Sequence, residues 1–169
     1  LTSIFDEFIS KSPRNSNNEL ALVNTRARLR MTTLYYLSGI NNYLVVGTGN
    51  KVEDFGIGFF TKYGDGGVDI SPIADLLKSE VYTLGEKLGI NNDILTAAPT
   101  DGLWENEKTD EDQIGATYIE LEWAMNFKGN ETLLSDREKE VLQIYTTLNH
   151  TNQHKMTEIP VCKIPQHLK

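Results

Sequence analysis

The chain has 169 residues, of which 39% are hydrophobic and 24% charged, and this length suffices for a single domain over residues 1–169 with its own core. Its formal net charge of −8 argues against nucleic acid or an anionic membrane as the main partner, and no apolar run approaches the roughly 18 residues that a bilayer crossing requires. The single cysteine, Cys162, excludes an internal disulfide framework and favours a reducing cytoplasm.

The N-terminal third has helical patterns. The chain begins with Leu1 rather than methionine, in the middle of such a pattern, which predicts a piece of a longer polypeptide. Apolar residues at helical spacing predict helices over residues 1–9 and 20–39, the second opened by Ser16 and Glu19 at capping-box spacing. The flanks of the second helix carry three arginines, Arg26, Arg28 and Arg30. For each of them, a solvated face and a place in a site are equally good interpretations.

A glycine-rich stretch over residues 45–69 organises the middle of the chain. The apolar run at 43–46 predicts a strand buried on both faces of a parallel sheet, and residues 68–70 predict a second short strand. Ser-Pro at 71–72 then opens a helical pattern that ends at Gly89. Strand, turn, strand and helix in this order indicate an open α/β sheet.

The C-terminal half alternates between loops and helical patterns. Residues 91–113 are irregular and acid-rich, as in a solvated loop or a mobile lid. Helices are expected over residues 118–127 and 135–148. The tail from His150 is basic and contains prolines, which predicts an extended strap.

Acidic side chains gather in the glycine-rich stretch. Glu53, Asp54 and Asp65 lie in or just after its turns, and Asp69 follows closely. Hard oxygen ligands beside backbone N–H groups at the end of a strand suit Mg²⁺ and a polyphosphate, because magnesium completes its shell from phosphate and water. On these residues alone, turn-forming acids are an alternative interpretation.

Several other kinds of site are excluded by their motifs. The sequence GTGNKVED matches neither the dinucleotide fingerprint nor the GxxxxGK[ST] phosphate loop. His150 and His154 stand four residues apart, but HTNQH lacks the glutamate of a zinc protease. Cys162 has no evident activating partner, which leaves nucleophilic catalysis unsupported.

In five separated blocks the sequence resembles NAD synthetases, the ammonia-dependent type in particular. These blocks are GTGNKVED, FFTKYGDGGVD, PIADLLKSEV, APTDGLW and NQHK, and the likeness extends from NTRARLRM at residue 24 to the histidine-lysine pair at residue 154. The resemblance implies a Rossmann-like, doubly wound α/β fold of the adenine nucleotide alpha hydrolase type. Its sheet would be mainly parallel, with helices on both faces, and here incomplete at the N-terminus. The resemblance also implies a homodimer.

The reaction implied by the resemblance is an ATP-dependent amidation of deamido-NAD. The nicotinate carboxylate attacks the α-phosphate of ATP, pyrophosphate leaves, and ammonia then displaces AMP to give NAD⁺. Because charge accumulates on phosphate oxygens and then on an acyl oxygen, the site should supply Mg²⁺, cations and hydrogen-bond donors. Two alternatives stay open: the synthetase part of a glutamine-dependent enzyme, and a noncatalytic nucleotide-binding module.

The resemblance also assigns roles to single residues. It places Thr48, Lys78 and Thr100 at ATP, with the Thr100 hydroxyl near the reacting phosphate or acyl oxygen. Glu53 would bind Mg²⁺, and Asp65 would position ammonia, so that Asp65, Thr100 and Lys78 are the expected catalytic residues. The residues expected to hold deamido-NAD are Arg28, Phe59, Lys62, Asp69, His154 and Lys155.

The sequence departs from the family's pattern in two places. The serine-glycine-glycine-x-aspartate-serine loop that grips pyrophosphate is absent from these residues. Its absence predicts that the N-terminal part of the enzyme lies outside this sequence and that this stretch alone is inactive. The segment from Glu53 to Phe59 is also one residue longer than in many relatives.

Overall fold

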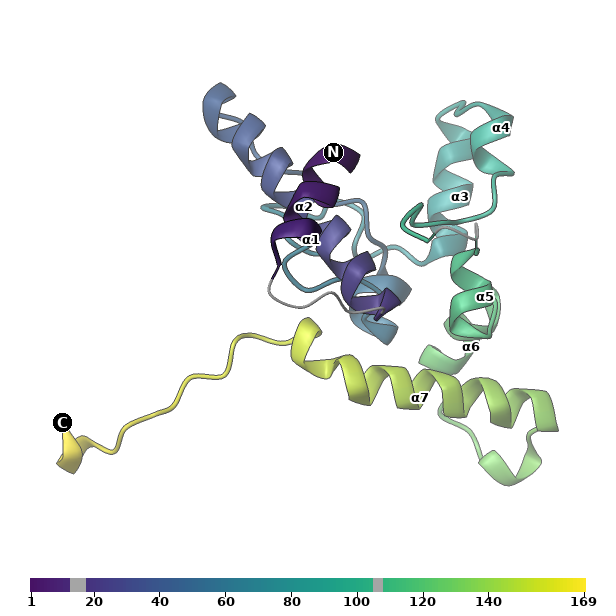
Figure 1. The fold of residues 1–169 in the computed structure, drawn as a ribbon. Coiled ribbons are helices and arrows are strands. Elements are labelled where there is room, and N and C mark those ends of the chain that lie inside the picture. Colours follow the sequence, from purple (N-terminus) through teal and green to yellow (C-terminus); the bar gives the residue numbers. More distant parts are fainter. Residues whose placement is uncertain (13–17, 105–107) are drawn as a thin grey trace.

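Helices make up most of this chain in the computed structural model, which describes residues 1–12, 18–104 and 108–169 (Figure 1). In chain order they are α1 (Thr2–Lys11), α2 (Glu19–Asn41), η1 (Val52–Ile57), α3 (Lys78–Lys87), α4 (Asn92–Leu95), α5 (Asp110–Ile114), α6 (Tyr118–Asn126), η2 (Glu131–Leu133), α7 (Asp136–Met156) and η3 (Gln166–Leu168). The element η1 is a π-helix, whereas η2 and η3 are 3₁₀ helices. Within the described ranges, none of the helices combines the length and the apolarity that a bilayer crossing needs.

The two N-terminal helices follow the predicted patterns, and α1 packs against α2. Ser16 of the predicted capping box lies outside the described residues. The N-cap of α2 is Asn18, whose side chain accepts a hydrogen bond from the Ala21 N–H at 3.0 Å. An asparagine in this position satisfies one of the backbone donors that the first helical turn leaves unpaired.

The predicted strands are reduced to a single parallel bridge in the part of the chain that the structure describes. Val46 pairs with Ile70, and the Asp69 N–H donates to the Val45 carbonyl at 2.9 Å. The prediction that residues 43–46 are buried on both faces is wrong, since Val45 is 7% exposed but Val46 is 53% exposed. Successive side chains of an extended segment point to opposite faces, and here only one face is covered.

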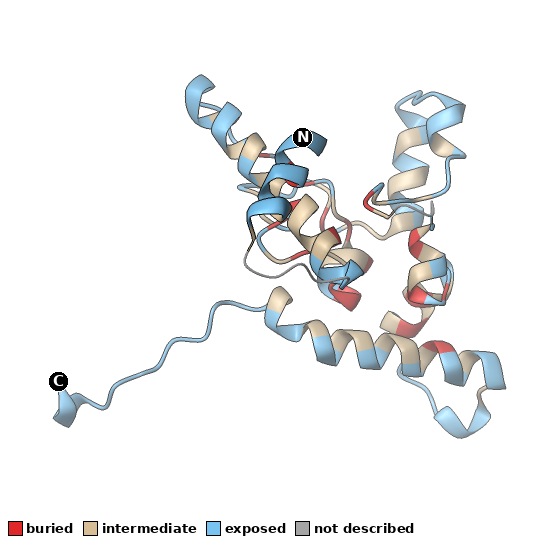
Figure 2. Cartoon of the chain, in the orientation of Figure 1, coloured by how far each residue is buried: buried red, intermediate tan, exposed pale blue. Residues whose placement is uncertain are grey.

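Buried side chains form two clusters, which Figure 2 shows in red near the middle of the molecule. The larger cluster joins η1 to α6 and α7, and its most deeply buried members are Val52, Ile57, Leu121 and Val141. The smaller one joins α2 to the loop before α5 through Val23, Ala27 and Leu103, with Trp104 beside them. Apolar burial therefore fixes η1 and α2, the two elements on either side of the predicted site.

Helix α3 begins later than predicted, at Lys78 rather than at the Ser-Pro pair. The residues before it form turns, and the carbonyl of Leu76 accepts a hydrogen bond from the Lys51 N–H at 2.8 Å. The Glu80 carboxylate accepts from the Leu77 N–H at 2.8 Å, which caps the first turn. The contact with Lys51 joins two separate segments, so a local pattern could not reveal it.

Residues 91–113, predicted to be irregular, contain the short helix α4 and all but the last residue of the short helix α5. Helix α5 is opened by a capping box in which Thr109 accepts from the Asp112 N–H at 3.1 Å. This signal was present in the sequence as threonine followed three residues later by an acid.

Helix α7 continues to Met156, past the predicted end at Leu148. Side chains from its last turns donate hydrogen bonds to carbonyls in and just after η1. These bonds run from Asn149 to Gly56 at 2.7 Å, from Asn152 to Ile57 at 2.9 Å, and from Lys155 to Gly58 at 3.0 Å and Phe60 at 2.8 Å. The predicted strap is wrong, because the tail after Met156 is exposed and extends away from α7 (Figure 1).

The end of η1 offers a test of this packing. Gly58 has a φ of 61°, and a Cβ there would lie 2.6 Å from the Cβ of Asn152. We expect Gly58→Ala to lower the free energy of unfolding by clearly more than the roughly 1 kcal/mol that positive φ alone costs. Gly89→Ala is the matched control, since Gly89 has a φ of 70° but no heavy atom within 4 Å of a Cβ. Urea unfolding of both variants measures the difference, and equal losses would contradict a role for the contact with α7.

Candidate active site

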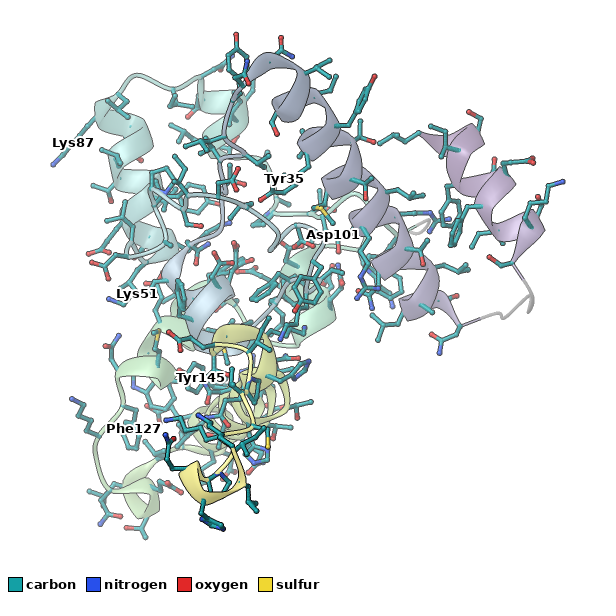
Figure 3. All side chains as sticks on the ribbon, turned by 90° about the vertical axis from the view of Figure 1, so that its left-hand side faces the viewer. Tyr35, Lys51, Lys87, Asp101, Phe127 and Tyr145 are labelled. Carbon is teal, nitrogen blue, oxygen red and sulfur yellow. The ribbon has the colours of Figure 1, made fainter. Side chains whose placement is uncertain are left out.

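A cavity of about 370 Å³ lies between α2, the loop after η1 and the end of α7. Five of the six residues predicted to hold deamido-NAD line it, namely Arg28, Phe59, Lys62, His154 and Lys155. The longer α7 is the reason that the last two reach the cavity, because a helix ending at Leu148 would leave them in the tail. Asp65 and Asp101 also line the cavity, and Figure 3 shows Asp101 beside α2.

Three cations in this cavity are held in place by the backbone. The Nε of Arg28 donates to the carbonyl of Lys62 at 3.3 Å, and the Lys62 ammonium donates to the carbonyl of His154. Lys155 is half-buried, and burial lowers the pKa of its ammonium, while the nearby Asp65 carboxylate opposes this shift. Preoriented cations around one cavity suit a ligand that carries phosphate groups.

A second cavity, of about 320 Å³, shares part of its wall with the first. Four residues line both: Phe60, Lys62, Asp65 and Lys155. Gly47, Gly49 and Asp54 line the far side of the second cavity, together with the first residues after α7. The two cavities therefore lie next to each other and share the cations Lys62 and Lys155.

Asp65 lies on this shared wall. Its Oδ1 accepts a hydrogen bond from the Thr61 N–H at 3.0 Å. Desolvation by the surrounding loop raises the pKa of the Asp65 carboxyl, and the Thr61 N–H partly offsets this by stabilising the carboxylate. The structure therefore fixes the orientation of this carboxylate on the wall that both cavities share.

The position of Asp54 explains Gly49, one of the glycines in the glycine-rich stretch. A Cβ on Gly49 would lie 2.2 Å from both carboxylate oxygens of Asp54, so a larger residue would displace that carboxylate. Burial, together with the neighbouring Glu53 and Asp65 carboxylates, raises the pKa of Asp54 to about 6. The density of glycine predicted a close approach of the backbone, and here the approaching group is a carboxylate of the same chain.

Glu53 and Lys78, predicted at Mg²⁺ and ATP, meet in an ion pair. The Lys78 Nζ lies 2.8 Å from the Glu53 Oε1, and the side chains are 19% and 15% exposed, respectively. Glu53 lies in the first turn of η1, and Lys78 is the first residue of α3. Because α3 begins at Lys78, the lysine lies beside Glu53, although the two residues are 25 positions apart in the sequence.

The carboxylates near Glu53 could hold magnesium only together with ligands from phosphate and water. Among the described residues, no group of three or more His, Cys, Asp or Glu side chains is arranged to hold a metal. Glu53 and the adjacent Asp54 nevertheless supply hard carboxylate oxygens. Magnesium commonly takes one or two such ligands and fills its remaining positions with phosphate and water.

The loop that contains Thr100 is fastened to α2 by two of the three arginines. Arg26 donates to the carbonyl of Leu103 at 3.1 Å, and Arg30 donates to the carbonyls of Asp101 and Gly102, both at 3.1 Å. Arg28 contributes to the cavity instead. None of the three arginines therefore belongs to a purely solvated face, which was one of the two interpretations that the sequence left open.

The threonines predicted at ATP lie in loops. Thr48 is exposed in the turn that follows Val46. The Thr100 hydroxyl donates to the carbonyl of Lys108 at 3.4 Å and accepts from the Gly102 N–H at 3.2 Å. Both threonines thus lie on loops rather than on helices, and the cavities described above include neither.

Asp69 is the one predicted deamido-NAD residue outside both cavities. Its carboxylate accepts from the Tyr35 hydroxyl at 3.0 Å and from the Val45 N–H at 2.8 Å. In this structure it connects α2 to the single parallel bridge.

Sequence reasoning missed the two asparagines that hold α7 against η1. Asn149 and Asn152 leave no trace in a hydrophobic pattern, because their contribution is a pair of hydrogen bonds to carbonyls more than 90 residues away. The only local signal is their spacing with Lys155, which places all three on one helical face.

Comparison with known proteins agrees with this geometry. The NAD synthase family profile matches residues 1–159. The NH(3)-dependent NAD(+) synthetase of Carboxydothermus hydrogenoformans is 43% identical over 145 residues, which are 85% of this chain and 56% of that protein. NMN synthetase from Francisella tularensis has a TM-score of 0.81 and 33% identity, over 97% of this chain and 63% of that one. An NH3-dependent NAD synthetase from Campylobacter jejuni has a TM-score of 0.70 and 26% identity, over 96% and 63%.

The chain spans just over half the length of the relative from Carboxydothermus. It shares its fold with solved NAD and NMN synthetases over nearly all of its residues. On the family match and these likenesses, the chain belongs to the NAD synthase family.

Proposed function

We propose that the protein containing this chain makes NAD⁺ from deamido-NAD, ATP and ammonia through an adenylated intermediate, with AMP and pyrophosphate as products. The observation that carries the proposal is the larger cavity, where α2, the loop after η1 and the end of α7 bring Arg28, Lys62 and Lys155 together. These cations match the phosphates of a dinucleotide, and the partly buried Phe59 ring offers a flat apolar surface to a nicotinate ring.

The ATP side of the site would use Lys78, Thr48 and Thr100. Lys78 is paired with Glu53, and in the proposed reaction its ammonium turns to phosphate oxygens as their charge develops. Glu53 would hold Mg²⁺, which when bound neutralises phosphate charge. The Thr100 hydroxyl, on a loop anchored by Arg30, would donate to the reacting phosphate or acyl oxygen.

The amidation side would use Asp65. Its carboxylate, on the wall shared by both cavities, would accept hydrogen bonds from ammonia or ammonium and orient it toward the acyl carbon. Asp69 would contribute to deamido-NAD binding only by exchanging its present partner, Tyr35, for the ligand.

The proposal extends to the assembly of the protein. The protein would form a homodimer and act in the cytoplasm. Its fold would be a doubly wound, mainly parallel sheet, to which the bridge between Val46 and Ile70 belongs. In its support, apolar side chains on the C-terminal half of α2 and on the extended segment after it are exposed, as expected for surfaces that pack against further structure. They include Leu34, Tyr36, Leu37, Ile40, Tyr43 and Leu44.

The test is an assay of the full-length protein with deamido-NAD, ATP and Mg²⁺, comparing ammonium with glutamine as the nitrogen donor. We expect NAD⁺ with ammonium alone. Product with glutamine in the absence of ammonium would instead indicate a glutamine-dependent enzyme, and no product from either donor would favour a noncatalytic nucleotide-binding module.

The likeness to an NMN synthetase suggests testing a second substrate in this assay. Nicotinate mononucleotide should be offered in place of deamido-NAD, because it presents the same carboxylate without the adenylate half. We expect deamido-NAD to be the better substrate by kcat/KM, and the opposite preference would transfer the proposal to NMN synthesis.

A further inference from the structure

One residue outside the predicted site, Tyr118, contacts the Lys78 ammonium, and a second, Asp110, holds Tyr118. The ring of Tyr118 lies with its centroid 4.7 Å from the Lys78 Nζ, on the same ammonium that pairs with Glu53. Tyr118 is 4% exposed and is the first residue of α6. Lys78 is thus held between a carboxylate and the face of a buried aromatic ring, which attracts cations.

Asp110 in turn fixes this ring. The Tyr118 hydroxyl donates to the Oδ2 of Asp110 at 3.2 Å, and Asp110 is 8% exposed as the first residue of α5. A second bond, from the Tyr118 N–H to Glu111 at 2.9 Å, ties the same two helix starts together. The other oxygen of Asp110, Oδ1, is buried with no hydrogen-bond partner among the described residues.

Asp110 also connects this cluster to the loop of Thr100. Its backbone N–H donates to the carbonyl of Pro99 at 3.0 Å, directly before Thr100. The start of α5 therefore contacts both elements: the Asp110 side chain holds the ring beside Lys78, and the Asp110 backbone holds the loop. Apolar packing does not explain why a buried carboxylate is retained here, since burying a polar group with an unfilled acceptor costs free energy.

We propose that Asp110 and Tyr118 are positioning residues that hold Lys78 for the reaction and keep the Thr100 loop in register with it. The inference rests on the proposed function, because Lys78 acts on ATP there. Neither residue contacts a substrate in this scheme. Asp110 orients the Tyr118 ring, and the ring limits where the lysine ammonium can lie.

The first experiment asks whether Tyr118 positions Lys78, and it does not require activity. The full-length protein, as wild type and Tyr118→Phe, is treated with trace acetic anhydride, and labelling of Lys78 is compared with that of the exposed Lys87 by mass spectrometry. We expect Lys78 to react more than about twofold faster in the variant, because a ring without its hydroxyl bond is freer to move. Unchanged labelling of Lys78 would overturn the proposal.

The second experiment asks whether the positioning acts on the reaction through Lys78. Tyr118→Phe should lower kcat/KM for ATP roughly tenfold in the wild-type background but hardly at all in a Lys78→Ala background. A purely structural role would give the same fold-loss in both backgrounds, and that result would overturn the proposal. Asp110→Ala should reproduce the loss, whereas Asp110→Asn should largely rescue it, because the amide oxygen still accepts from the tyrosine hydroxyl.

Tyr145→Phe is the matched control. Tyr145 packs against the same buried cluster as Tyr118, but its hydroxyl has no hydrogen-bond partner among the described residues, and we expect neither labelling nor kinetics to change. If Lys78 labelling responds to Tyr118→Phe while the wild-type protein makes no NAD⁺, the positioning stands and the proposed function fails. A failure of the proposed function can therefore be told apart from a failure of the positioning role.

Discussion

Replacing Lys78 with alanine is expected to slow adenylate formation by about 10²- to 10³-fold in the full-length protein. The ammonium pairs with Glu53 and lies next to a buried ring, so it is well placed to meet charge that develops on phosphate. Exchange of labelled pyrophosphate into ATP, dependent on deamido-NAD, measures this half of the reaction directly. The protein should stay folded, because Lys78 lies outside both buried clusters.

Lys51→Ala is the control for this substitution. Lys51 forms an ion pair of similar length with Asp75, at 2.9 Å, but the two side chains are 39% and 97% exposed. An exposed pair of this kind contributes about 0–1 kcal/mol to stability, and we expect exchange to be unchanged. If both lysine variants lost exchange equally, or if Lys78→Ala unfolded the protein, Lys78 would be a structural residue.

The second large effect is expected for Asp65→Asn, in the other half of the reaction. The asparagine keeps an oxygen for the Thr61 N–H, so the loop should hold its conformation while the charge is lost. We expect kcat/KM for ammonium to fall on the order of 10²-fold, as for loss of a positioned proton acceptor, whereas pyrophosphate exchange should persist. Steady-state kinetics against ammonium, beside the exchange assay, separate the two halves.

The pH dependence gives Asp65 a further readout. Desolvation raises the pKa of its carboxyl, so the carboxylate is lost at a higher pH than in an exposed aspartate as the solution is acidified. In the wild type, the fall of kcat/KM for ammonium at low pH should therefore have an apparent pKa above that of an exposed aspartate. In Asp65→Asn this fall should be missing. Asp75→Asn, at an exposed carboxylate, serves as control and should keep the wild-type fall. An unaltered fall in Asp65→Asn would assign it to another group.

Local sequence patterns accounted for much of the helical structure. Helices α1, α2 and α6 lie where apolar residues recur at helical spacing, since that spacing alone puts a stripe on one face. The motif blocks placed most of the proposed substrate-binding residues, because each block is a short run whose chemistry is visible without knowing the fold. The extra residue noted between Glu53 and Phe59 coincides with the π-helix η1, whose turns hold more residues than those of an α-helix.

The tertiary structure alone decided which of those residues meet. Asn149, Asn152 and Lys155 extend α7 through hydrogen bonds to carbonyls near η1, and this extension carries His154 to the cavity. The ion pair between Glu53 and Lys78 likewise depends on where α3 begins. Contacts between side chains and distant carbonyls have no period along the sequence, so no local pattern predicts them. The sequence by itself therefore determined the family, and packing determined which of the proposed site residues lie around the two cavities.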